Sequence, residues 1–448
     1  MTRSIGVLIS GTALAHAITA TAMPVATRLF TPQDFAAATT FSSLVGVLVV
    51  AACLRYELAL PLPEDEVEAV NLLALSCGLT VAFTLVVAGI MALIPPAGYA
   101  LLGQPGLTPW IWLLPPAMLI GGLYLALQMW YVRKKGFGAI ARSRVTQSAA
   151  AAAAQLGMGF AGAAPQGLLV GQMFNYGAGA VGLGVGLLFK ERALLRRVSW
   201  QGVVQVARIH QRFPRFSVME ALANAASIHL PVLLIAALTV GPEAGYLALA
   251  MFLLQAPMAL VGNAVGQVYL SGAPDAHREG RLAVFTSEMM ARLMKAAAGP
   301  IVFLAVAAPA AIGLVFGADW TRAGVLVSWM APWFLLQFVA APASTALHVV
   351  GRQSWAMMLQ MFGLVLRSGM VVLAIVIDAR FATEAFAISG FVFYAIFNAV
   401  VLRAAGALPL AGLSALRASA APALIGLFIG LLVSITTASI SEQLVKGG

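Results

Sequence analysis

An arginine inside a long apolar run is the first residue whose chemistry needs an explanation. Arg367 lies near the middle of residues 354–377. A charge at that depth of a bilayer costs several kcal/mol, so such residues are usually functional. Gln353, Gln360 and Arg367 are seven residues apart, which aligns them as one polar stripe on a helix. Two interpretations remain: Arg367 and Gln360 line a cavity that binds phosphate groups, or Arg367 is a structural partner of another helix.

A second cationic stripe enters the apolar run 289–316. Its members are Arg281, Glu288, Arg292 and Lys295, whose steps of seven, four and three keep them on one helix face. This face either lines the inner mouth of a cavity, where Arg292 and Lys295 bind phosphate, or lies in the interface and contacts anionic lipid. Glu288 and Arg292 also have the i,i+4 spacing of a helical ion pair.

Two further charges lie near the inner end of the apolar run 36–60. Arg55 is another candidate for binding phosphate, unless it extends to the membrane surface. Arg55 and Glu57 are two residues apart, so on a helix they point in different directions. We therefore do not expect them to pair.

Three titratable residues are candidates for binding a coupling proton or cation: His16, Glu57 and Glu220. His16 shares a helix face with three threonines and is otherwise a packing histidine. Glu220 shares a face with an asparagine and a serine and is otherwise the ion-pair partner of Arg215.

Catalytic motifs are missing from the sequence. It contains no Gly-Lys dipeptide, and therefore no phosphate-binding loop of the ATPase type. No His or Cys cluster has the spacing of metal ligands, and Cys53 and Cys77 both lie in apolar runs. A membrane glycosyltransferase or polymerase would need acids on a large outer loop, whereas the first outer loop holds only Asp34. We therefore expect no metal, no cofactor and no enzymatic activity.

The composition defines the elements that must position these residues. Of 448 residues, 61% are hydrophobic and 9% are charged, against about 25% charged in soluble proteins. These values exclude a soluble enzyme and a disordered chain, and the continuous apolar runs argue against a β-barrel. They predict an all-α polytopic membrane protein. The net charge of +10 is explained by basic loops on the inner side of the membrane and not by nucleic-acid binding.

Apolar runs of about 20 residues, the length that crosses a bilayer, recur thirteen times. The predicted spans are 4–26, 36–60, 68–94, 109–132, 141–162, 165–189, 215–240, 244–270, 289–316, 323–347, 354–377, 381–402 and 420–440. With the N-terminus inside, eighteen of the 26 Lys and Arg residues lie on the inner side and four on the outer side. We therefore expect a cytoplasmic N-terminus and an outer C-terminus. The first apolar run continues past Ala17 to Val25, which favours a retained span over a cleaved signal peptide.

The chain divides around its longest inner connection. We expect an N-lobe of six spans at 1–190, a basic linker at 191–214, a C-lobe of six spans at 215–403, and a linker with a thirteenth span at 404–448. The linker either forms a short amphipathic helix on the inner membrane surface or is a solvated connection. The openings of the two lobes, residues 11–17 and 219–225, are alike. Six spans per copy is an even number, so the lobes would be parallel repeats around a central cavity.

Residues 1–75 carry a family resemblance. The segment Thr27-Arg-Leu-Phe-Thr-Pro-Gln-Asp-Phe35, followed by Leu54-Arg-Tyr-Glu-Leu-Ala-Leu-Pro61 and the acidic stretch that begins at Glu64, resembles the polysaccharide and O-antigen flippases. These proteins are similar to a wider exporter superfamily that includes multidrug extruders and the lipid II flippase. Two departures are Ala36, where the family usually has glycine, and the thirteenth span.

The resemblance implies a multi-pass protein of the bacterial inner membrane. It implies a flippase that moves undecaprenyl-pyrophosphate-linked oligosaccharide from the cytoplasmic to the periplasmic leaflet by alternating access. The product would serve O-antigen, capsule or exopolysaccharide biosynthesis. Implied partners are this lipid-linked substrate, membrane lipids, a polysaccharide polymerase and glycosyltransferases, with H+ or Na+ as candidate coupling ions. The alternative is a multidrug or metabolite extruder, which the buried cations disfavour because its substrates are often cationic.

Overall fold

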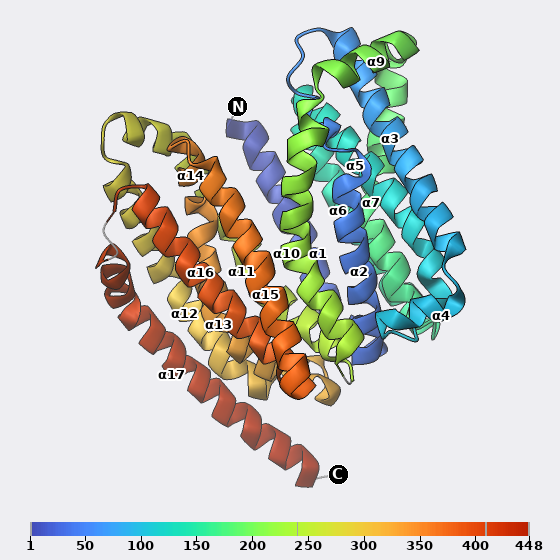
Figure 1. The fold of residues 1–448 in the computed structure, drawn as a ribbon. Helices are drawn as coiled ribbons and strands as arrows, with labels where there is room; N and C mark the ends of the chain where they lie inside the picture. Colours follow the sequence, from blue (N-terminus) through green and yellow to red (C-terminus); the bar gives the residue numbers. More distant parts are fainter. Residues whose placement is uncertain (1, 240, 408–409, 447–448) are drawn as a thin grey trace. The chain divides into compact units, whose positions relative to one another are not determined.

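The computed structural model describes residues 2–239, 241–407 and 410–446, which form helices and turns with no β-strand among them. The chain folds into two compact units, Met1–Ala237 and Leu238–Gly448, and each is described by itself. Figure 1 shows the helices of both units in sequence colours. The boundary between the units falls at the end of the seventh long helix, so this helix belongs to unit 1 with the first six. The parallel repeat of 1–190 and 215–403 remains a prediction.

Unit 1 contains seven long helices. They are α1 (Thr2–Leu29), α2 (Pro32–Ala52), α3 (Glu66–Leu93), α5 (Leu114–Arg133), α6 (Phe137–Phe160), α7 (Gln166–Lys190) and α10 (Val218–Leu238). Short elements connect them: η1 (Tyr56–Ala59), α4 (Pro96–Tyr99), η2 (Ala100–Leu102), η3 (Thr108–Leu113), α8 (Arg192–Leu195), α9 (Trp200–Ile209) and the π-helix η4 (Phe213–Ser217).

Unit 2 contains six long helices. They are α11 (Glu243–Arg278), α12 (Leu282–Phe316), α13 (Thr321–Ala343), α15 (Gln353–Asp378), α16 (Ala382–Ala404) and α17 (Leu410–Lys446). The short elements η5 (Ala318–Trp320), α14 (Ala346–Val349) and η6 (Ala379–Phe381) lie at their ends.

A long helix coincides with each of the thirteen predicted spans. The described residues include nine stretches long and apolar enough to cross a membrane, and one of these, Ser354–Ala404, contains both α15 and α16. The prediction of an all-α multi-pass membrane protein is therefore confirmed.

The end of the second span was predicted wrongly. Its apolar sequence continues to residue 60, but α2 ends at Ala52. Leu54 and Arg55 then adopt left-handed backbone conformations, with φ of 47° and 63°. Two such residues in succession reverse the chain direction and exclude a continuous α-helix. The chain resumes in η1, where Tyr56, Ala59 and Leu60 are buried in the apolar core of unit 1.

The basic linker contains a short helix, α9, and its place on the membrane surface stays a prediction. Ser199 caps α9, because its side-chain oxygen accepts the backbone N–H of Gly202 at 3.1 Å. Val206 is the residue that α9 buries, at 2% exposure, whereas Ile209 is 54% exposed. Val206 is buried because α9 packs on α3.

The first turn between long helices is a local cap. Thr31 and Asp34 form a capping box at the start of α2: each backbone N–H donates to the other residue's side chain. The Asp34 carboxylate therefore stabilises the start of α2.

Candidate functional site

Arg367 is buried within unit 2. Its residue exposure is 4%, and its guanidinium carbon lies 4.3 Å from the ring centre of Phe393, 5.4 Å from that of Tyr394 and 5.6 Å from that of Trp333. These rings come from α16 and α13, so a cation of α15 is enclosed by two neighbouring helices. Aromatic faces stabilise a desolvated guanidinium by about 2 kcal/mol or more. The arrangement fits the structural interpretation in this conformation, and substrate binding by Arg367 stays a prediction. Gln360 is half-buried two turns away, and the side chain of Gln353 lies outside the described residues.

The cationic stripe of α12 is exposed. The Arg292 side chain is 83% exposed and lies 3.5 Å from Glu288, which is the i,i+4 ion pair predicted from the sequence. Lys295 is also exposed, one turn further along the helix. Arg281 is the residue before the helix and pairs with Glu279, so it does not extend the stripe. Arg292 and Lys295 are accessible to an anion or to lipid, and both interpretations remain open.

Arg55 and Glu57 form an ion pair, which corrects the expectation that they would point apart. Arg55 Nη1 lies 3.5 Å from Glu57 Oε1. The expectation assumed helical geometry, whereas Arg55 is left-handed and Glu57 begins a new turn. The side chain of Glu57 is 3% exposed and that of Arg55 is 26% exposed. Burial raises the pKa of Glu57, and its backbone hydrogen bond and the charge of Arg55 offset part of that rise.

The other two coupling candidates are less enclosed. His16 is exposed on α1, on the same face as Thr12, whose hydroxyl accepts a hydrogen bond from Arg144 Nη1 at 2.7 Å. Glu220 is exposed in the first turn of α10, and the ion pairs of the described residues include none between it and Arg215. Of the three candidates, Glu57 alone is buried. Their roles in coupling stay predictions.

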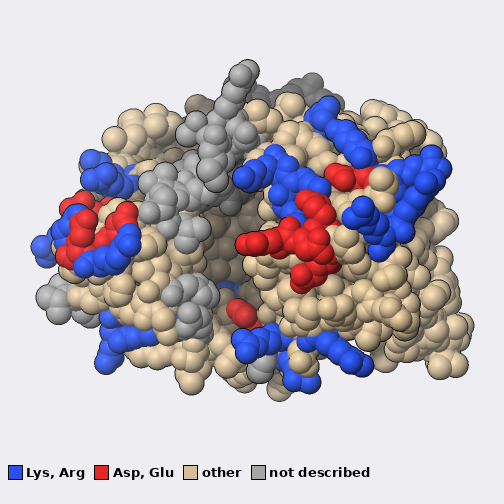
Figure 2. Space-filling model, turned by 90° about the horizontal axis from the view of Figure 1, so that it is seen from above, with Lys and Arg blue, Asp and Glu red and all other residues tan. Residues whose placement is uncertain are grey.

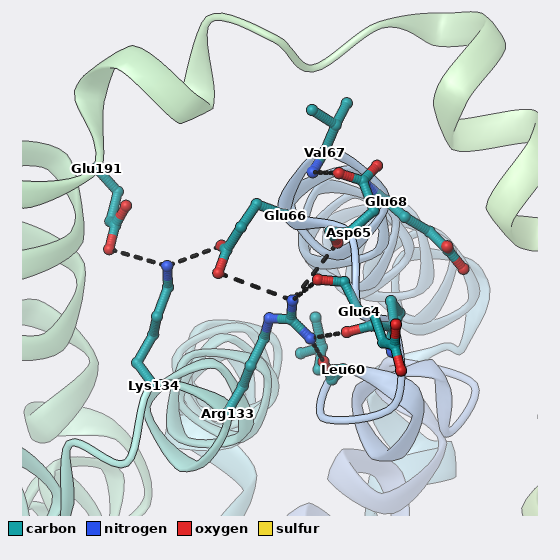
Figure 3. Close-up of polar contacts among 10 residues, drawn as sticks. Leu60, Glu64, Asp65, Glu66, Val67, Glu68, Arg133, Lys134 and Glu191 are labelled. Carbon is teal, nitrogen blue, oxygen red and sulfur yellow. Dashed lines mark hydrogen bonds and ion pairs between the residues drawn. The ribbon is translucent and has the colours of Figure 1, made fainter.

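A charged network closes the turn between η1 and α3 (Figure 3). Arg133, at the end of α5, donates hydrogen bonds to the carbonyl oxygens of Leu60, Pro63, Glu64 and Asp65. Lys134 lies 2.7 Å from Glu66 and 3.4 Å from Glu191. Burial alone would lower the pKa of Lys134, but its hydrogen bond to Glu66 and the charges of Glu191 and Glu66 raise it. The network fixes the turn that follows Glu57.

Helix α9 is anchored beside this network. The Ser199 backbone N–H donates to Asn71 Oδ1 at 3.0 Å, and the Tyr56 hydroxyl donates to the Ala207 carbonyl at 2.9 Å. A Cβ on Gly202 would lie 2.7 Å from Asn71, so only glycine permits this approach. Figure 2 looks onto this end and shows Asp and Glu side chains beside Lys and Arg.

The sequence interpretation missed a charged cluster in unit 2. Arg322 binds both Glu243 and Glu384, and the Thr383 hydroxyl lies between the two carboxylates. Glu243, Arg322 and Glu384 each lie in the first turn of a helix, and this position is the local sequence signal that could have identified them. The side chains of Glu243 and Glu384 are 16% and 10% exposed.

Solved structures of membrane transporters share this fold. A lipid II flippase MurJ in an inward closed conformation matches with a TM-score of 0.73 at 10% identity, over 99% of this chain and 100% of that chain. An inward-facing MATE multidrug resistance transporter of the MOP superfamily matches with a TM-score of 0.63 at 15% identity, over 89% of this chain and 94% of that chain. A MOP superfamily transporter from Pyrococcus furiosus matches with a TM-score of 0.51 at 14% sequence identity, over 90% of this chain and 95% of that chain. The fold is that of the MurJ and MATE transporters.

The sequence itself shows the family. A family model described as polysaccharide biosynthesis protein matches residues 25–324, which is more than half of the chain. The chain belongs to this family, and the resemblance carried by residues 1–75 is confirmed. No curated protein matches the chain.

Proposed function

We propose that this protein moves an undecaprenyl-pyrophosphate-linked oligosaccharide from the cytoplasmic to the periplasmic leaflet of the bacterial inner membrane, by alternating access. The observation that carries the proposal is membership of a polysaccharide biosynthesis family over residues 25–324. A fold shared with a lipid II flippase supports it, because lipid II is named there as the substrate of that protein. The translocated glycan would feed O-antigen, capsule or exopolysaccharide assembly.

The chemistry of such a substrate requires a few accessible cations. Its pyrophosphate is dianionic and its sugars cannot cross hydrocarbon unaided, whereas its prenyl chain can stay in the bilayer. Arginine binds phosphate oxygens bidentately, and lysine binds them as a point charge. Arg55, Arg292 and Lys295 are exposed or partly exposed and are our candidates for this contact. Arg367 would join them in a conformation that opens its aromatic enclosure.

The direction of transport follows from the predicted orientation. Basic residues concentrate in the loops on the side of the N-terminus, which the positive-inside rule assigns to the cytoplasm. The substrate would be loaded there, near Arg55 and the turn closed by Arg133. The polymerase and glycosyltransferases of the same pathway are the proposed partners.

A drug or metabolite extruder is the second candidate, because MATE multidrug transporters share the fold. Extruders of cationic drugs bind them with acidic and aromatic groups. The aromatic rings around Arg367 would suit such a substrate only if the arginine moved away.

Reconstitution separates the two candidates. The full chain is placed in liposomes with a fluorescent undecaprenyl-pyrophosphate oligosaccharide, and exposure of the glycan on the far leaflet is measured. Wild-type protein should move it, and Arg292→Gln with Lys295→Gln should slow this at least about tenfold, since each charged hydrogen bond contributes about 1.5–3 kcal/mol. Arg278→Gln is the matched control, an exposed arginine at the end of α11. Expulsion of cationic dyes without movement of any lipid-linked glycan would favour the extruder.

A further inference from the structure

The Arg55–Glu57 pair is built at a turn with an irregular backbone in unit 1. Leu54 and Arg55 are both left-handed, a conformation that costs about 1–2 kcal/mol for each residue that is not glycine. Strained backbone conformations persist where the surrounding structure stabilises them, and they are common at functional sites. Here this conformation turns the chain so that the carboxyl group of Glu57 is buried directly behind the partly exposed guanidinium of Arg55.

The pair leaves both groups incompletely satisfied. Glu57 Oε2 and Arg55 Nε are buried, and no described residue supplies a hydrogen-bond partner for either atom. The one contact between the side chains, from Nη1 to Oε1, is long at 3.5 Å. An ionised buried carboxylate held by one long ion-pair contact and one backbone hydrogen bond is costly. The raised pKa of Glu57 agrees with that cost.

Few other charges reach this carboxyl group. Arg133 of α5 donates to the carbonyl groups of the following turn and lies 3.8 Å from Glu66. The charge of Arg215 in η4 lowers the pKa of Tyr56, although burial raises that pKa more. The charge of Glu57 also acts on the Cys53 thiol at the end of α2, whose pKa is raised by burial and, to a smaller extent, by Glu57. Arg55 is therefore the cation whose charge favours the ionised form of Glu57, against the larger effect of burial.

We propose that Arg55 exchanges Glu57 for a phosphate oxygen of the substrate, and that Glu57 takes up one proton from solvent as the exchange occurs. The inference rests on the proposed function and adds how substrate and proton are linked at this site. Arg55 has five N–H donors but a single charge. A pyrophosphate at its exposed edge competes directly with the carboxylate for that charge. Once Arg55 turns to phosphate, the neutral carboxylic acid is the stable form of Glu57.

The step balances with solvent as the only proton source. One ion pair, Arg55 to carboxylate, is replaced by one ion pair, Arg55 to phosphate, and one O–H bond forms on Glu57. By linkage, substrate affinity must rise as pH falls across the titration of Glu57, by up to about tenfold per pH unit for one proton. The bound substrate must in turn make Glu57 harder to deprotonate.

Calorimetry on the full chain in lipid nanodiscs tests the exchange. The probe is N-acetylglucosamine joined through pyrophosphate to a short prenyl chain, because both of its phosphates are esterified and neither titrates near neutral pH. Binding is measured over a range of pH in two buffers of different ionisation enthalpy, which gives the number of protons taken up. Wild-type protein should take up close to one proton per ligand and bind more weakly as pH rises.

Variants at the two positions should separate the two halves of the exchange. Glu57→Gln should bind at least as tightly as wild type at every pH and take up no proton at this site, because its neutral amide cannot compete for Arg55. Arg55→Gln should bind at least about tenfold more weakly. Glu64→Gln, a carboxylate exposed in the next turn, and Arg142→Gln, an exposed arginine of α6, are matched controls that should behave as wild type.

The outcomes distinguish the exchange from the proposed function. Binding by wild type without proton uptake, or the same uptake in Glu57→Gln, overturns the exchange and leaves the flippase standing. Failure of the wild type to bind the probe overturns both.

Discussion

Arg322 joins two carboxylates from different helices of unit 2. Its Nη2 lies 2.7 Å from Glu384 Oε1, and its Nε lies 3.2 Å from Glu243 Oε1. The Thr383 hydroxyl lies 2.9 Å from Glu243 Oε2 and 3.0 Å from Glu384 Oε2, but it has one proton and can donate to one carboxylate at a time. The arginine therefore carries most of the compensation and holds the starts of α11, α13 and α16 together.

Removal of this cation should destabilise unit 2. In Arg322→Gln the two carboxylates lose their shared partner and repel each other. We expect a loss of about 2–4 kcal/mol in the free energy of unfolding, less than for a fully buried pair because the Arg322 side chain is 29% exposed. Thermal unfolding in detergent measures it. The double variant Arg322→Gln/Glu384→Gln should recover part of the loss, and an unchanged melting temperature in the single variant would contradict the account.

Glu57 predicts a pH dependence of stability. Its pKa is raised in the folded protein, so the fold favours the protonated form. The stabilisation is fully present below the ordinary pKa of glutamate and is lost as pH rises through the raised value. Wild-type protein should therefore melt at lower temperature as pH rises through this window, and Glu57→Gln should lose this dependence. Glu64→Gln, which keeps the buried carboxyl, should follow the wild type.

The hydrogen bond from Ser199 to Asn71 should help to hold α9 in place. In Asn71→Ala the Ser199 backbone N–H loses its acceptor, and Gly202→Ala would push a Cβ to within 2.7 Å of Asn71. Either change should raise the hydrogen–deuterium exchange rates of the α9 amides by about tenfold, which corresponds to the loss of one hydrogen bond of about 1 kcal/mol or slightly more. Gln201→Ala, on the exposed face, should leave the rates unchanged. Equal rates in all four proteins would mean that other contacts attach the helix.

Replacement of Arg367 should affect transport and stability differently. Replacement of a buried charge by an apolar side chain of similar length is often neutral or stabilising. Arg367→Met should therefore unfold at a temperature close to that of wild type, since its side chain can fill the space among Trp333, Phe393 and Tyr394. If Arg367 contacts the substrate, glycan movement should fall at least about tenfold in the same variant. Normal transport together with normal stability would leave Arg367 as a packing residue only.

Helix positions could be predicted from the sequence because hydrophobic run length is a local property. Thirteen runs gave thirteen helices. The end of α2 could not be predicted in this way. The sequence stays apolar through Leu60, and the turn at Leu54 and Arg55 is fixed by burial of Tyr56 and Ala59 in a core that distant helices complete.

Charged residues in apolar runs could be singled out from the sequence, but partners on other helices could not. Arg367 was identified by its charge in an apolar run, yet its ring partners come from α13 and α16. The ion pair of Glu288 and Arg292 was predictable because it lies within one helix. The cluster around Arg322 was not, because Glu243, Arg322 and Glu384 lie far apart in the chain and are brought together only by tertiary packing.

The thirteenth long helix crosses α12 at very close range. A Cβ on Gly426 would overlap the carbonyl oxygen of Gly299, and one on Gly299 would lie 3.0 Å from that of Pro422. Small residues permit this approach, and in a bilayer the contact is stabilised by dispersion and not by exclusion of water. Rotation or sliding of α12 would drive side chains into the backbone of α17. The two helices are therefore mechanically coupled, and any motion of α12 during a transport cycle must carry α17 with it.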